Sequence, residues 1–195
     1  MTTTIDLIRH GEPVGGKLFR GWQDDPLSDL GWQQMRQAVE GIRPWQRIIS
    51  SPLLRCAEFA QELSDKLDLP WRAEPRLREI GFGDWEGKDY DQLRIDDPEG
   101  LAGFWRDPTA HPAPGGETMA SFQSRVEAGW QDLLTQHQGE HLLLVAHGGV
   151  NRLIIAQVLG LPIANMFRME VPYAAVSRII VDDGFPRLAF HCGRP

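Results

Sequence analysis

The chain carries the stretch Leu7-Ile8-Arg9-His10-Gly11 close to its N-terminus and repeats the pattern at Leu144-Val145-Ala146-His147-Gly148-Gly149. In both stretches an apolar run of strand length ends in a histidine followed by glycine. Ligands of open α/β sheets bind beyond the carboxyl ends of the strands, and glycine there lets the backbone approach a ligand or turn sharply. We therefore expect both histidines at one site, although they lie far apart in the sequence.

Strand-like and helix-like segments alternate along the chain. Strands are predicted at residues 4–8, 47–50, 71–73, 141–146, 176–181 and 187–191, and helices at 29–42, 52–67, 89–96, 101–107, 118–137 and 150–159. Ser51 is expected to cap the second helix, with Pro52 at its first position. This alternation predicts the α/β class, as a three-layer α/β/α sandwich with a mostly parallel central sheet and helices on both faces.

The length of 195 residues favours a single domain over residues 1–195. Prolines and glycines interrupt the regular elements between the third strand and the long helix at 118–137, so we expect a lid-like insertion at about 88–116.

The composition excludes several classes of protein. Hydrophobic residues make up 42% and charged residues 24%, which is ordinary for a soluble globular chain. The net charge of −7 argues against nucleic-acid and membrane partners. No apolar run reaches transmembrane length and no signal peptide is visible. Two cysteines are too few for a disulfide scaffold, so a reduced, cytoplasmic setting is expected.

Basic side chains gather at the predicted strand and helix ends. Arg55 falls in the first turn of its helix and leans toward the helix N-terminus, where free N–H groups favour anions. Arg9 and Arg55, together with His10 and His147, would form a cationic cradle in an acidic protein. Phosphate fits such a cradle because arginine donates paired hydrogen bonds to its oxygens.

An acidic segment follows the third predicted strand. Within Leu77–Gly87, Glu79, Asp84 and Glu86 lie among glycines and aromatic residues. A carboxyl beside a phosphate dianion and aromatic rings has a raised pKa, which suits proton donation to a leaving oxygen. All three carboxyls are candidates for that role on composition alone.

Taken in order, these motifs resemble the histidine phosphatase superfamily, also called phosphoglycerate mutase-like. The motifs that carry the resemblance are Arg9-His10-Gly11-Glu12, Asp25–Gly31, Ser50–Ala57, Leu77–Gly87, Pro114–Thr118 and Val145–Gly149. The resemblance implies a phosphoglycerate mutase-like fold and the hydrolysis of a small phosphate monoester through a phosphohistidine, with no metal or cofactor.

The resemblance also implies roles for individual residues. His10 would be the nucleophile and Glu79 the general acid. The implied catalytic residues are His10, Glu79, His147, Arg9 and Arg55. The implied substrate-binding residues are Arg9, Arg55, His147 and Gly148.

Within the family the chain is most similar to the α-ribazole phosphatases of cobalamin biosynthesis. The similarity lies in the compact Arg9–Gly21 loop, in Phe82–Gly87 and in Gly148–Pro162. The expected substrate is α-ribazole 5′-phosphate or adenosylcobalamin 5′-phosphate. Because the leaving group carries a flat base, Trp22 and Trp105 are predicted to bind it by stacking.

Other functions stay open at this point. A broad-specificity sugar-phosphate or nucleotide phosphatase shares the same catalytic residues. A phosphoglycerate mutase is disfavoured because the insertion is short and holds few basic residues, namely Lys88, Arg94 and Arg106. A phosphohistidine-protein phosphatase and a non-catalytic phospho-ligand binder are further alternatives. Both a monomer and a homodimer fit the sequence.

Overall fold

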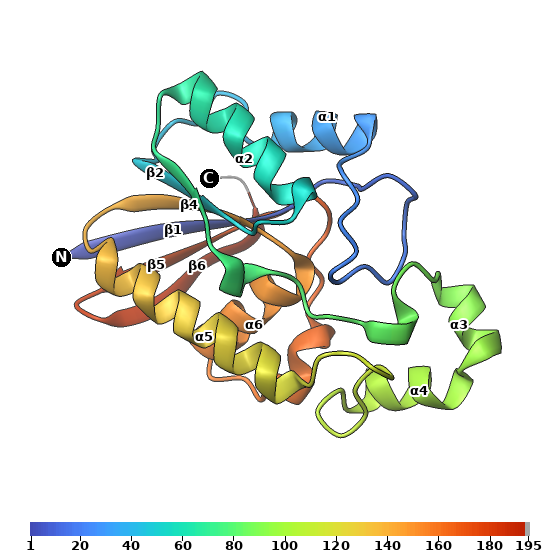
Figure 1. Ribbon diagram of the computed structural model, residues 1–195. Coiled ribbons are helices and arrows are strands. Elements are labelled where there is room, and N and C mark those ends of the chain that lie inside the picture. The colour runs from blue at the N-terminus through green and yellow to red at the C-terminus, as the bar shows by residue number, and fades with distance from the viewer. Residues whose placement is uncertain (194–195) are drawn as a thin grey trace.

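Six strands form a single sheet at the centre of the protein (Figure 1). The computed structural model describes residues 1–193. Its strand order is β3-β2-β4-β1-β5-β6, with β1 (Thr2–Arg9), β2 (Arg47–Ser50), β3 (Trp71–Ala73), β4 (His141–Ala146), β5 (Val176–Asp182) and β6 (Phe185–Gly193). The strands β3, β2, β4 and β1 are parallel, and β5 and β6 join antiparallel at one edge. The predicted mostly parallel sheet is confirmed.

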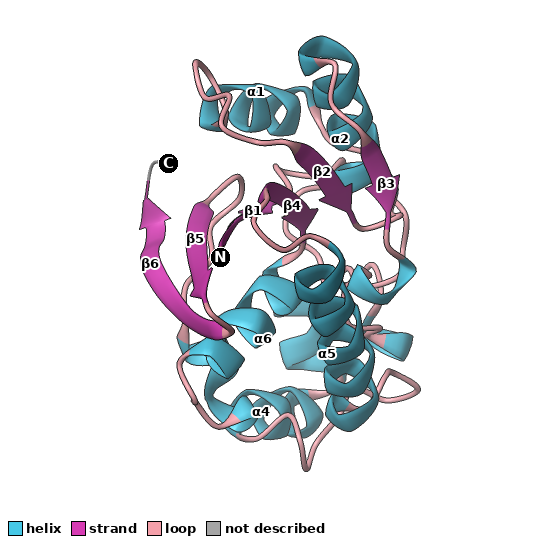
Figure 2. Ribbon diagram, turned by 90° about the vertical axis from the view of Figure 1, so that its left-hand side faces the viewer, coloured by secondary structure: helices cyan, strands magenta, loops and turns pink. Residues whose placement is uncertain are grey.

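Helices cover both faces of this sheet (Figure 2). The helices α1 (Asp29–Ala38) and α2 (Leu54–Leu67) pack on one face, and α5 (Met119–Gln136) and α6 (Gly148–Val158) on the other. Side chains of a strand point to alternate faces. In β4, Leu142 and Leu144 therefore join the α5–α6 core, while Leu143 and Val145 join the α1–α2 core. Burial on both faces explains the continuous apolar run of β4 and confirms the three-layer architecture.

The segment between the third strand and α5 carries its own small hydrophobic cluster. It contains the helices α3 (Tyr90–Asp96) and α4 (Pro98–Arg106) and the 3₁₀ helices η1 (Pro75–Leu77) and η2 (Gly83–Trp85); a third 3₁₀ helix, η3 (Ile163–Arg168), follows α6. The cluster consists of Trp85, Leu93, Leu101, Phe104 and Ala113. Phe82 and Phe167 pack against both this cluster and the main core, and so join the two.

Several helix boundaries differ from the predictions for physical reasons. The first helix ends at Ala38 instead of residue 42, since turns follow and Gly41 has a φ of 74°. The helix α4 begins at Pro98 instead of residue 101, because Asp97 accepts a hydrogen bond from the Gly100 N–H and caps it.

The start of α2 is the instructive difference. The prediction that Ser51 caps this helix is wrong, because the helix begins at Leu54 and the Ser51 hydroxyl lies 2.7 Å from Nε2 of His147. Asp24, from a distant loop, accepts the Leu54 N–H at 2.7 Å instead. None of the helices within residues 1–193 is long and apolar enough to cross a membrane.

A buried carboxylate in β1 binds side chains from three other segments of the chain. Asp6 of β1 is fully buried and accepts hydrogen bonds from Trp45, His141 and Arg178 at 2.7–3.0 Å. Burial alone would raise the pKa of Asp6, but the hydrogen bonds from His141, Arg178 and Trp45 outweigh it and hold the pKa below its usual value.

We expect Asp6→Ala to lower the free energy of unfolding by about 3 kcal/mol, because it leaves the buried partners of a charged network unpaired. A carboxylate with a lowered folded-state pKa stabilises the protein above its unfolded-state pKa of about 3.9, and this stabilisation is lost as the pH falls through the folded-state value. Urea unfolding at pH 7 and at pH 3–5 measures both effects. The exposed Asp65→Ala is the control, and equal stability of the two variants at pH 7 would contradict the prediction.

Candidate active site

The pairing of β1 with β4 brings the two predicted histidines together. The register pairs Arg9 with Ala146, so His10 and His147 leave neighbouring parallel strands side by side. Their ring centroids lie 5.2 Å apart and the planes meet at 64°. Both rings are buried, which confirms the expectation that the two histidines share one site.

Hydrogen bonds fix how each ring faces the site. Nδ1 of His10 lies 2.7 Å from the Gly11 carbonyl oxygen, and since that oxygen can only accept, Nδ1 carries the proton. In the neutral ring Nε2 of His10 is then left with a free lone pair. Burial lowers the pKa of both histidines well below the usual value, and the nearby Arg55 and Arg9 lower it further. Both rings are therefore neutral near pH 7.

The two arginines are held by backbone carbonyls instead of carboxylates. The guanidinium of Arg55 is fully buried and donates to the carbonyls of Gly21 and Gln23, each at 2.8 Å. Arg9 donates to the Val171 carbonyl at 2.6 Å and lies 4.2 Å over the ring of Tyr173. In both arginines the buried Nε–H has no hydrogen-bond partner. Buried donors are rarely left unpaired, so these two point to an anion as the missing acceptor.

Of the three candidate carboxyls, Glu79 is the one at the site. It is buried and lines the same cavity as His10, and its two oxygens accept the N–H groups of Ile80 and Gly149 at 3.1 and 2.9 Å. Asp84 is exposed, and Glu86 binds backbone N–H groups away from the cavity. Position alone therefore separates three carboxyls that composition could not.

Two glycines allow the charged groups to approach the start of α6. A Cβ atom on Gly149 would lie 2.3 Å from Oε1 of Glu79. A Cβ on Gly148 would lie 2.8 Å from Nη1 of Arg152 and 3.4 Å from Nε of Arg9. Any larger residue would displace these side chains, which accounts for the glycine pair after His147.

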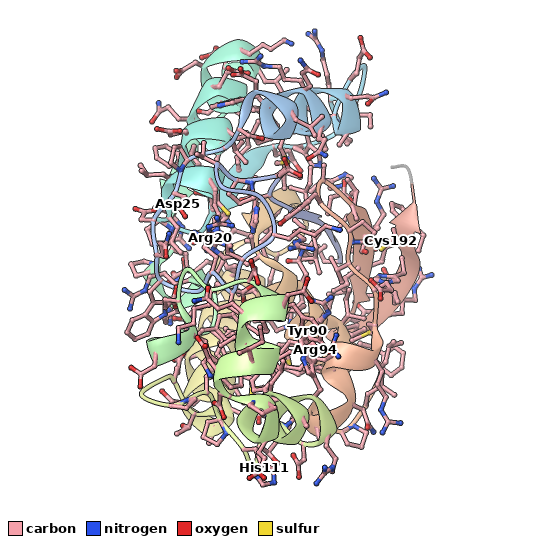
Figure 3. All side chains as sticks on the ribbon, turned by 90° about the vertical axis from the view of Figure 1, so that its right-hand side faces the viewer. Arg20, Asp25, Tyr90, Arg94, His111 and Cys192 are labelled. Atoms are coloured by element: carbon pink, nitrogen blue, oxygen red, sulfur yellow. The ribbon has the colours of Figure 1, made fainter. Side chains whose placement is uncertain are left out.

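The cavity has a volume of about 360 Å³ and one aromatic wall. Its lining residues are Arg9, His10, Lys17, Leu18, Phe19, Arg20, Glu79, Ile80, Phe82, Tyr90, Trp105, Gly148, Gly149, Arg152, Phe167 and Tyr173. Tyr90 of α3, labelled in Figure 3, and Trp105 of α4 are each about half exposed at the rim. Arg55 and His147 are fully buried and do not belong to this lining.

The structure separates the two tryptophans that were predicted to bind substrate. Trp105 lines the cavity, but Trp22 does not and instead borders a different hollow. The indole of Trp22 donates to the Glu79 carbonyl at 3.0 Å, and the Arg78 guanidinium lies 4.8 Å over its ring. Trp22 is thus placed to support the backbone of Glu79 and not to contact a ligand in the cavity.

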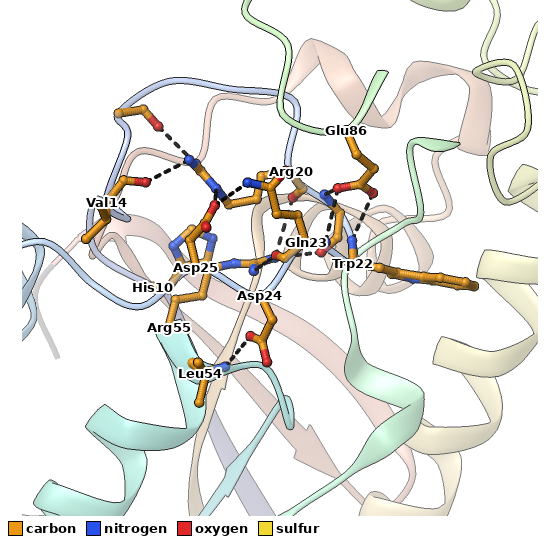
Figure 4. A network of polar contacts seen from close by, with 12 residues as sticks. His10, Val14, Arg20, Trp22, Gln23, Asp24, Asp25, Leu54, Arg55 and Glu86 are labelled. Carbon is orange, nitrogen blue, oxygen red and sulfur yellow. Dashed lines mark hydrogen bonds and ion pairs between the residues drawn. The ribbon is translucent and has the colours of Figure 1, made fainter. Parts of the chain in front are cut away.

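Three basic residues of the cavity escaped the sequence analysis. Arg20 is buried and donates to the carbonyls of Val14 and Gly16 and to the carboxylate of Asp25 (Figure 4). No sequence signal shows that it turns inward. Lys17 lines the cavity from the same loop. Arg152 could have been found, because it lies one helical turn after Gly148 on α6.

Cys56 packs against His147, with its sulfur 3.7 Å from Nε2 of the ring, and neither cysteine lines the cavity. Cys56 is buried in α2 with its sulfur 3.4 Å from the Ala146 carbonyl oxygen, and burial raises the pKa of its thiol. These contacts indicate that Cys56 is a packing residue. Within residues 1–193 no three His, Cys, Asp or Glu side chains gather closely enough to hold a metal ion.

Comparisons with known proteins agree with this geometry. Residues 5–192 match the model of the histidine phosphatase superfamily, branch 1. The chain is 32% identical over 187 residues to the adenosylcobalamin/α-ribazole phosphatase of Salmonella typhimurium, covering 93% of this chain and 92% of the relative. It is 33% identical over 170 residues to the glucosyl-3-phosphoglycerate phosphatase of Mycolicibacterium vanbaalenii, covering 82% and 75%.

A solved structure shows the same fold. The α-ribazole phosphatase of Shigella flexneri superposes with a TM-score of 0.84 at 28% identity and covers 98% of this chain and 96% of its own. The fold is that of enzymes acting on small phosphate esters, and the chain belongs to the histidine phosphatase superfamily.

We expect His10 and His147 to titrate below the usual histidine value of about 6.5, because burial and two arginines disfavour the imidazolium. An NMR titration of the phosphate-free protein measures both midpoints, with His10→Ala and His147→Ala assigning the signals. A midpoint at or above 6.5 for either ring would contradict this electrostatic description of the site.

Proposed function

We propose that the chain hydrolyses a phosphate monoester through a phosphohistidine on His10. Nε2 of His10 attacks phosphorus, and the bond from phosphorus to the alcohol oxygen breaks. Glu79 gives its proton to that departing oxygen and becomes a carboxylate. The carboxylate then takes a proton from the water that attacks the phosphohistidine, which releases inorganic phosphate and restores neutral His10.

One observation carries this proposal more than any other. The unpartnered, buried Nε–H groups of Arg9 and Arg55 accompany a histidine whose lone pair is free. A phosphoryl group seated there would accept both donors, with His147 and the N-terminus of α6 at Gly148 as further donors. Positive groups fixed before the reaction stabilise the charge that gathers on the equatorial oxygens of the transition state.

We propose α-ribazole 5′-phosphate, or adenosylcobalamin 5′-phosphate, as the substrate. The support comes from the relatives that carry this activity in their names and from the aromatic wall, because a flat base can stack on it. Tyr90 and Trp105 reach the cavity from the insertion at 88–116, which suits its role as a lid. The unpaired cysteines, Cys56 and Cys192, agree with a cytoplasmic setting.

A second candidate substrate class is a phosphate ester with a carboxylate on its alcohol. Lys17 lines the cavity, and Arg152 uses only its Nε, on the Met169 carbonyl at 2.8 Å. Its two terminal nitrogens make no hydrogen bond within residues 1–193 and could bind a second anion. The similarity to a glucosyl-3-phosphoglycerate phosphatase points the same way.

Glu79→Gln should slow alkyl phosphates by about 100-fold or more, because a poor leaving group needs a proton in the transition state. The loss on p-nitrophenyl phosphate should be much smaller, since nitrophenolate departs without protonation. Steady-state kinetics on both esters measures the difference. Equal losses on the two substrates would argue against Glu79 as the acid.

A substrate panel tests the specificity. We expect kcat/KM for α-ribazole 5′-phosphate to exceed that for sugar phosphates, nucleotides and glucosyl-3-phosphoglycerate by about 100-fold, which equals about 2.7 kcal/mol of transition-state binding. Trp105→Ala should reduce this advantage by about 1–3 kcal/mol, the usual contribution of one stacked base. Phe185→Ala, an exposed aromatic on β6, is the control. A preference for the carboxylate ester that Arg152→Met abolishes would establish the second candidate instead.

A further inference from the structure

We infer that Glu86 is a positioning residue that fixes Arg55 in place through the backbone segment 20–23. This inference rests on the proposed phosphoryl-binding role of Arg55 but not on the identity of the leaving alcohol. Glu86 and Arg55 lie on opposite sides of the segment and make no direct contact (Figure 4).

Glu86 collects backbone donors with both of its oxygens. Oε1 accepts the N–H groups of Trp22 and Phe82, each at 2.9 Å. Oε2 accepts those of Gly21 and Gln23 at 2.9 and 3.1 Å. Three consecutive peptide N–H groups of one loop therefore converge on a single carboxylate.

The carbonyls of the same segment serve Arg55. Its Nη atoms donate to the oxygens of Gly21 and Gln23 at 2.8 Å, and a longer contact of 3.4 Å reaches Arg20. The peptides are thus held between a carboxylate on their N–H side and a guanidinium on their C=O side. Such hydrogen bonds polarise one another, so each strengthens the next.

The next residue of the loop fixes the backbone around Arg55. Asp24 accepts the N–H of Leu54, the residue directly before Arg55, at 2.7 Å. Side chain and backbone of Arg55 are consequently tied to one short loop. The Nε–H of the Arg55 guanidinium has no hydrogen-bond partner in the loop. This unpaired donor indicates a ligand that binds there.

The close approach of loop and carboxylate depends on Gly21. A Cβ atom there would lie 2.5 Å from Oε1 of Glu86 and 2.0 Å from the Ile80 carbonyl oxygen. On the far side, Arg20 and Gln23 both donate to Asp25, which braces the ends of the segment.

This arrangement solves an electrostatic conflict. A carboxylate paired directly with Arg55 would hold it firmly but would compete with the phosphoryl group for its charge. Neutral carbonyls position the guanidinium and leave its charge available. The anion that orders those carbonyls is placed one peptide away, in Glu86.

The test is Glu86→Gln. The amide nitrogen of glutamine would replace one carboxylate oxygen and would face two backbone N–H donors. Because donors repel each other, the segment and Arg55 should shift. We expect kcat/KM for p-nitrophenyl phosphate to fall by about 10- to 100-fold, as for comparable misplacement of catalytic groups. The inhibition constant of inorganic phosphate should rise by about tenfold or more. The control is Glu74→Gln, a buried carboxylate that binds Arg76 away from the cavity and should leave both values unchanged.

A double-mutant cycle with Arg55→Met separates positioning from general stability. If Glu86 acts through Arg55, adding Glu86→Gln to Arg55→Met should cost little more in phosphate affinity or rate. Additive losses, or a folded Glu86→Gln protein with the original phosphate affinity, would overturn the inference.

Gly21→Ala displaces the same segment while keeping the carboxylate, and it serves if Glu86→Gln does not fold. It should show the same loss of phosphate affinity, and an unchanged affinity would again overturn the inference. Because both probes lack the ribazole group, failure of the proposed substrate would not affect these results.

Discussion

The parallel pairing of β1 with β4 is the constraint on which the site depends. In this pairing the His10 N–H donates to the Ala146 carbonyl at 2.9 Å. The two histidines therefore directly follow paired residues at the carboxyl ends of the two strands. Residues that follow neighbouring parallel strands meet at one edge of a sheet. Arg9, the last residue of β1, and the N-terminus of α6 after His147 then reach that edge without any further arrangement.

The site concentrates buried positive charge in a chain whose net charge is −7. Backbone carbonyls, and not carboxylates, carry the nearest contacts of Arg9 and Arg55, so their charges remain unbalanced until an anion enters. Burial lowers the pKa of His10 and His147, and the charges of Arg55 and Arg9 lower it further, so both rings are neutral. The arginine charges that attract a phosphate dianion thus also help to keep the imidazole of His10 neutral and nucleophilic.

Regular periodicity made the sheet, its faces and the meeting of the two histidines predictable. The differences arise where a side chain has two possible partners. Ser51 reads as a helix cap in sequence, yet it contacts His147, and a distant Asp24 caps the helix. Glu79 and Glu86 lie in the same acidic segment, yet Glu79 lines the cavity while Glu86 and Trp22 border a different hollow. Such choices depend on contacts between distant segments, which local sequence does not encode.

The separate hydrophobic cluster of α3 and α4 has an evolutionary consequence. The two main cores cover both faces of the sheet, whereas the small cluster lies behind part of the cavity wall. Its own members do not line the cavity, but Phe19, Phe82 and Phe167, which pack against it, do. Substitutions around Leu93 or Leu101 could therefore reshape the insertion without loosening the catalytic edge. Only Phe82 and Phe167, among the described residues, pack against both the main α5–α6 core and the small cluster, and both also line the cavity. Relatives would then diverge in substrate preference through changes in the insertion that carries α3 and α4. Phe82 and Phe167 would keep that insertion packed on the main core, and the catalytic residues would stay unchanged.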